Sequence, residues 1–94
     1  GVTGVRERIG DSTLKLVERV RRHTDMPLLA GFGISTRKQA AAVVSAGADG
    51  AIAGSVYARV YVKNLENPEE TLPEIAGLVG QIKQGCIEGY KQQR

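Results

Sequence analysis

Two short apolar runs constrain the fold of this chain more than any other feature. Neither run contains a charged residue, and a glycine ends or directly follows each. The runs cover residues 27–32 and 50–54. Runs of this length are typical of buried strands, and a helical pattern lies between them. Strands that alternate with helices pair in parallel through right-handed crossovers. The sequence therefore predicts an α/β fold with two parallel strands at these positions.

Helices are predicted around these strands by the spacing of apolar residues. In the first segment Leu14, Val17 and Val20 recur every three residues between charged side chains, which is the pattern of an amphipathic helix. Similar patterns give four helical segments, residues 12–23, 35–46, 55–62 and 68–90. In the last segment the expected buried face consists of Leu72, Ile75, Leu78, Val79 and Ile82. We expect these apolar faces to pack on one layer of sheet.

Residue types at the segment ends predict where each helix begins or ends. Ser12 and Ser35 are the expected N-caps of the first two helices, since a serine hydroxyl accepts a hydrogen bond from the first turn. Gly47 is expected to end the second helix. The last helix has two possible starts: one with Pro68 in its first turn, and one with a capping box that begins at Thr71.

Length and composition narrow the function classes. A chain of 94 residues suits one small domain, and its apolar runs are too short for a membrane span. Its formal charge of +3 comes from interspersed residues, and with one Phe and no Trp it offers no stacking platform for nucleic acid. The start has no Met and no basic-then-apolar segment, so we expect no signal peptide. It also lacks a leading structural element, so we expect a chain cut from a longer one. The single Cys86 fits a reducing compartment, and therefore a cytoplasmic location.

Glycine-rich segments follow both predicted strands, at residues 31–35 and 54–55. The carboxyl ends of parallel strands lie at one edge of a sheet, where α/β proteins bind ligands. Each segment also leads into a helix N-terminus, which favours an anion. A (β/α)8 barrel often binds phosphate with the loops after its last two strands and a short extra helix, and residues 55–62 match that helix. The spacing predicts a phosphate site, although tight turns alone would also explain the glycines.

Three motifs make the chain resemble the C-terminal part of the tryptophan synthase alpha chain. They are GVTG at residues 1–4, PLLAGFGIS at residues 27–35 and AGADGAIAGS at residues 46–55. The resemblance implies a (β/α)8 TIM barrel, of which residues 1–94 form a single partial domain from loop 6 through helix 8.

The resemblance also implies a lyase of tryptophan biosynthesis. Members of the family cleave indole-3-glycerol phosphate to indole and glyceraldehyde 3-phosphate in a retro-aldol reaction. The substrate phosphate would be held by the backbone amides of Gly4, Gly33, Gly54 and Ser55. Gly31 and Phe32 would form the wall of the seventh loop, and Thr3 would support the sixth. The partner would be the beta chain in an α2β2 assembly, and pyridoxal phosphate belongs to that partner, so this chain needs no cofactor of its own.

Retro-aldol cleavage requires an acid for the indole ring and a base for the glycerol hydroxyl. In the family two carboxylates on or near the second strand do this work, and this chain corresponds to a later part of the barrel. Asp49 precedes its strand and so lies at the end of the barrel that serves stability. We therefore expect no catalytic residue in this chain, no metal site, and no activity of the chain alone.

Two alternatives stay open at this stage. The chain could be the tail of another phosphate-binding barrel, for example from histidine or thiamine biosynthesis, although the GVTG motif at residues 1–4 argues against this. It could also be a free-standing phosphate-binding or assembly module that completes a barrel with another chain.

Overall fold

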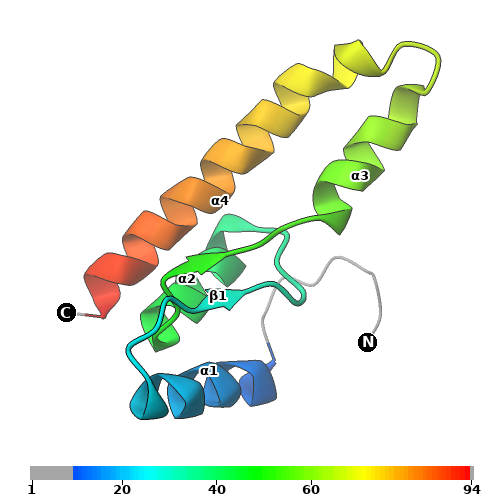
Figure 1. Cartoon of the computed structure of the whole chain (residues 1–94). Coiled ribbons are helices and arrows are strands. Elements are labelled where there is room, and N and C mark those ends of the chain that lie inside the picture. The colour runs from blue at the N-terminus through cyan, green and yellow to red at the C-terminus, as the bar shows by residue number, and fades with distance from the viewer. Residues whose placement is uncertain (1–9, 94) are drawn as a thin grey trace.

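The computed structural model describes residues 10–93 and has the predicted alternation of helices and strands (Figure 1). In chain order its elements are α1 (Asp11–His23), β1 (Leu29–Ala30), α2 (Arg37–Ala46), β2 (Gly50–Ala51), α3 (Ser55–Tyr61), the 3-10 turns η1 (Val62–Asn64) and η2 (Pro68–Thr71), and α4 (Leu72–Gln92). None of the described helices is long and apolar enough to cross a membrane.

The two strands form a small parallel sheet, as the sequence predicts. Leu29 lies opposite Gly50 and Ala30 opposite Ala51, and the amide of Ile52 donates to the carbonyl of Ala30 at 2.9 Å. Each strand is only two residues long, so the predicted bounds of 27–32 and 50–54 are wrong. The reason is that a strand extends only as far as its ladder, and each of these strands has a single neighbour within the described residues.

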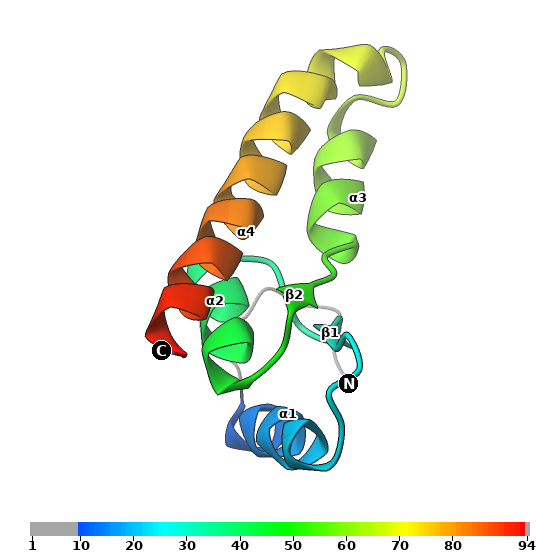
Figure 2. The same ribbon diagram turned by 60° about the vertical axis from the view of Figure 1, so that its left-hand side comes forward.

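Helix α2 lies between α1 and the C-terminal half of α4 (Figure 2). The buried cluster between them contains Val17, Ile34, Ala40, Val43, Val44, Ala48 and Ile82. Its members are small or β-branched residues, which allow neighbouring helices to approach closely. The core is therefore built mainly on α2, and the sheet covers one side of it.

The two glycines near the end of α4 determine how closely this helix packs against α2. Gly85 and Gly89 are buried, and a Cβ atom on either would overlap a backbone carbonyl of α2, that of Arg37 or Ala41 respectively. The predicted apolar face of α4 is therefore correct only in part. Ile82 is buried, whereas Leu72 and Val79 are exposed, because they lie in the first half of α4, which extends away from α2. The part of α4 that meets α2 packs through glycine rather than through large side chains.

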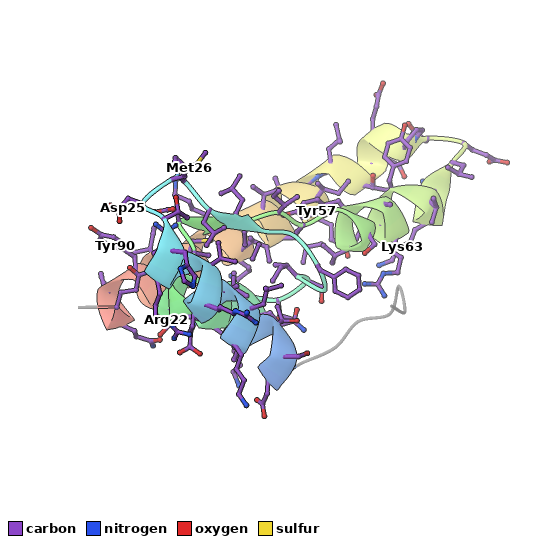
Figure 3. All side chains as sticks on the ribbon, turned by 60° about the horizontal axis from the view of Figure 1, so that its bottom comes forward. Arg22, Asp25, Met26, Tyr57, Lys63 and Tyr90 are labelled. Carbon is purple, nitrogen blue, oxygen red and sulfur yellow. The ribbon has the colours of Figure 1, made fainter. Side chains whose placement is uncertain are left out.

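Helix α3 and the first half of α4 extend away from the rest of the molecule as a helical hairpin (Figure 1). The longest dimension of the molecule is 47 Å. Lys63, at the far end of this hairpin (Figure 3), donates to a carboxylate oxygen of Glu74 at 3.2 Å. Val60 is buried between the two arms. The hairpin is thus closed by one apolar contact region and a surface ion pair.

The N-caps of the first two helices differ from the predicted ones. Helix α1 begins one residue earlier than expected, after Gly10, and Ser12 lies within it. Helix α2 is capped by Thr36, whose hydroxyl accepts a hydrogen bond from the amide of Gln39 at 3.2 Å, and Ser35 lies outside the helix. Gly47 ends α2 as predicted, with a φ of 134°. Several neighbouring hydroxyls can each cap a helix, so the path of the preceding chain decides which one does.

The last helix begins after Thr71 and not at Pro68. Pro68 opens the 3-10 turn η2, and α4 follows directly at Leu72. The hydroxyl of Thr71 donates to the carbonyl of Pro68 at 2.6 Å, so it does not cap α4. The predicted capping box is therefore absent, because its hydroxyl is used by the preceding turn.

One carboxylate holds α1 to the amino ends of both strands. An oxygen of Asp49 accepts hydrogen bonds from the amide of Leu28 at 2.8 Å and from the guanidinium of Arg21 at 3.0 Å. The same guanidinium donates to the carbonyl of Met26 at 2.9 Å. Asp49 thus has the structural position that the sequence predicts.

We expect Asp49→Ala to lower the free energy of unfolding by about 1–2 kcal/mol, because the amide of Leu28 and the guanidinium of Arg21 would lose their acceptor. Urea unfolding of the chain measures this change. Asp25→Ala is the matched control, since Asp25 is exposed and has no ion-pair partner within residues 10–93. Equal effects of the two substitutions would show that the Asp49 contacts add nothing to stability.

Candidate functional site

The predicted ligand loops leave the same edge of the sheet. Residues 31–35 follow β1, and Gly54 and Ser55 follow β2 by a few residues. The two segments that follow the strands run side by side where they leave the sheet. A Cβ atom on Gly31 would lie 3.2 Å from the Cβ of Ile52. The parallel pairing therefore brings the carboxyl-end loops of both strands together. Thr3 and Gly4 lie outside the described residues.

Both loops present open backbone. A Cβ atom on Gly33 or Gly54 would meet no other atom within 4 Å. Gly33 has a φ of +77°, which side chains rarely adopt, so glycine is required there by the turn itself. Phe32, beside it, is 65% exposed. There is thus open space beside Gly33 and Gly54, where a ligand could approach the backbone N–H groups.

Ser55 begins α3, with Gly54 as the N-cap. The amides of Tyr57 and Ala58 donate to the carbonyl of Gly54 at 3.0 and 3.1 Å, so the helical hydrogen bonds start after the glycine–serine pair. The first amides of a helix have no partner within it and carry its positive dipole end. The pair therefore offers donors of the type that an anion requires.

Sequence reasoning missed one buried polar residue at this edge. Gln39 is 1% exposed, and its side-chain oxygen accepts hydrogen bonds from the amide of Ser35 at 2.7 Å, the hydroxyl of Ser35 at 3.0 Å and the amide of Thr36 at 3.1 Å. The residue was detectable, because Thr36 and Gln39 have the spacing of a capping box. With Ser35 as the predicted N-cap, the residue three positions further along is Lys38 and not Gln39.

No acidic residue belongs to either loop. Three carboxylates of the described residues form ion pairs elsewhere: Asp49 with Arg21 at 3.0 Å, Glu88 with Arg37 at 3.2 Å and Glu74 with Lys63 at 3.2 Å. Nor do the described residues contain a group of three His, Cys, Asp or Glu side chains arranged to hold a metal ion. The loops thus provide neutral backbone donors and no acid or base.

The cavity between the sheet and α4 lies apart from these loops. It measures about 550 Å³ and is lined mainly by apolar groups, including Leu29, Val79 and Cys86, with Tyr57 and Tyr90 also on its wall. Burial, together with the neighbouring Cys86, raises the pKa of the Tyr57 hydroxyl above its usual value. Its lining includes none of the predicted site residues.

Comparisons of the sequence with protein-family models and with curated proteins point to the same family. The model of a family described as the tryptophan synthase alpha chain matches residues 1–87. The alpha chain of Methanoregula boonei is 43% identical over 86 residues, which are 92% of this chain and 32% of that protein. The alpha chain of Methanopyrus kandleri is 39% identical over 92 residues, which are 98% of this chain and 33% of that protein.

The chain thus spans about a third of the length of the curated relatives that it matches. No solved structure gives a significant match. Because the family match covers nearly all of the sequence and includes all three motifs, the chain belongs to the tryptophan synthase alpha chain family.

Proposed function

We propose that residues 1–94 form the C-terminal third of a (β/α)8 barrel, a single partial domain from loop 6 through helix 8. Two observations support this. The relatives are about three times as long as the chain. Large apolar side chains in the sheet and directly after it are exposed, namely Leu29 at 59% and Ile52 at 53%. Additional strands and helices in a complete barrel would cover this surface.

We further propose that the chain supplies the phosphate-binding part of a lyase that cleaves indole-3-glycerol phosphate to indole and glyceraldehyde 3-phosphate. The observation that carries the proposal is the pair of open glycine loops at one sheet edge. The backbone amides of Gly4, Gly33, Gly54 and Ser55 would hold the phosphate, with Gly31 and Phe32 as the wall beside it and Thr3 as support. Amides in fixed positions suit an anion without requiring a cationic side chain.

The acid and base of the reaction would come from the preceding part of the barrel, since neither described loop has a carboxylate. The chain would need no cofactor or metal of its own. Its partners would be the phosphorylated substrate and the tryptophan synthase beta chain, which holds pyridoxal phosphate, and its location would be the cytoplasm. Indole released at this site would be the substrate passed to the beta chain.

The phosphate site is tested by two substitutions in a barrel reconstituted from this chain and a supplied N-terminal part. Gly54→Leu should raise KM for indole-3-glycerol phosphate more than tenfold, since the side chain would fill the space of the phosphate. Within the described residues a Cβ atom at this position meets nothing within 4 Å, and φ is −130°, so the substitution does not require a positive φ. Ser55→Ala keeps the amide and removes one hydroxyl, which costs about 1 kcal/mol, or roughly fivefold in KM.

Gly80→Leu is the control, since Gly80 is equally open but lies on α4, away from both loops. It should leave KM unchanged. Small, equal effects of Gly54→Leu and Ser55→Ala would place the phosphate elsewhere and reduce Gly54 to a turn residue.

A further inference from the structure

The side chain of Gln39 folds back from the first turn of α2 onto the end of the loop that precedes the helix. Its one oxygen accepts three hydrogen bonds, two from Ser35 and one from the amide of Thr36, at 2.7–3.1 Å. The residue is 1% exposed, so water does not compete for these bonds. Gln39 is therefore a buried clamp on the backbone directly after the loop.

The clamp determines the shape of the loop because of what lies next to it. Ile34, between Gly33 and Ser35, is 4% exposed and belongs to the buried core. The backbone is thus fixed at Ile34 by packing and at Ser35 and Thr36 by the oxygen of Gln39. Gly33, with its φ of +77°, is joined directly to this fixed segment. The direction of the Gly33 amide consequently depends on an anchor two residues further along the chain.

The side-chain nitrogen of Gln39 explains why a neutral residue occupies position 39. Its nitrogen, Nε2, is buried and has no hydrogen-bond partner within the described residues, which costs free energy. A glutamate would cap the helix equally well and would bury no N–H group. It would also add a negative charge beside the loop. Glutamine avoids that charge at the cost of an unpaired donor.

We propose that Gln39 is a positioning residue for phosphate binding, a neutral clamp that orients the Gly33 amide without repelling a phosphate dianion. The inference rests on the proposed phosphate site. It makes two separable claims: that the oxygen of Gln39 holds the loop, and that the absence of charge preserves anion affinity.

Two variants, made in the barrel reconstituted from this chain and a supplied N-terminal part, separate these claims. Gln39→Leu removes the acceptor, so hydrogen exchange at the amides of Ser35 and Thr36 should accelerate, and affinity for inorganic phosphate should fall about tenfold. Gln39→Glu keeps an acceptor, which its three donors maintain in the ionised form. Exchange should then stay slow while phosphate affinity still falls about tenfold. Exchange is followed by NMR, and affinity by titration of the Gly33 amide with inorganic phosphate.

Gln84→Leu and Gln84→Glu are the matched controls, since Gln84 is exposed on α4; neither should change exchange or affinity. Full phosphate affinity in either Gln39 variant would overturn the inference while leaving the phosphate site intact. If Gln39→Leu does not fold, Gln39→Glu alone decides. An unsubstituted barrel that binds no phosphate would overturn the proposed function instead. Unchanged exchange in Gln39→Leu would overturn the claim that the oxygen of Gln39 holds the loop, whether or not phosphate binds.

Discussion

Gly85→Ala is expected to destabilise the chain strongly. The new Cβ atom would overlap the carbonyl oxygen of Arg37 and lie 3.0 Å from the Cβ of Ala40. Backbone cannot yield as a flexible side chain can, so α2 and α4 would have to separate. Overpacking of this kind typically costs about 1–3 kcal/mol and occasionally more. This is a large fraction of the stability of a small domain.

The matched control is Gly80→Ala on the same helix, where a Cβ atom meets nothing within 4 Å. Alanine favours a helix over glycine by about 1 kcal/mol, so this substitution should stabilise the chain. Urea unfolding followed by circular dichroism gives both values. A stabilised Gly85→Ala variant would show that α2 and α4 do not approach each other as closely as the structure places them.

The chain alone is expected to release no indole from indole-3-glycerol phosphate above the rate in buffer. The reaction requires an acid and a base in contact with the substrate, and neither described loop carries one. The carboxylates of Asp49 and Glu88 are engaged by Arg21 and Arg37. A phosphate site by itself would bind the substrate without cleaving it.

Indole release is measured with the chain alone, with a supplied N-terminal part alone, and with the two together. Activity should appear only in the mixture. Turnover by the isolated chain within tenfold of about 10 s⁻¹, a typical enzyme value, would contradict the assignment of catalysis to the other part of the barrel.

Local patterns were sufficient for the element order and for the family. The period of Leu14, Val17 and Val20 predicts α1 because a helix repeats every 3.6 residues, and the charge-free runs predict parallel strands because both are flanked by helices. The placement of the two glycine loops at one edge follows from parallel pairing alone. The three motifs, the last of which ends at Ser55, identified the family that the comparison confirms.

Only the tertiary structure decided the features that depend on contacts between distant segments. The strands are shorter than their apolar runs because ladder length depends on the neighbouring strand. Thr36 rather than Ser35 caps α2, since burial of Ile34 fixes the path of the chain before the helix.

The packing face of α4 and the role of Gln39 have the same origin. Periodicity favours large apolar residues as a buried face, but α2 approaches so closely that only Gly85 and Gly89 fit between the two backbones. Glutamine is usually a surface residue. The side chain of Gln39 is buried because it folds back and its oxygen accepts hydrogen bonds from three donors. Sequence period specifies which residues share a face, whereas the distance between the elements determines which of those residues are buried.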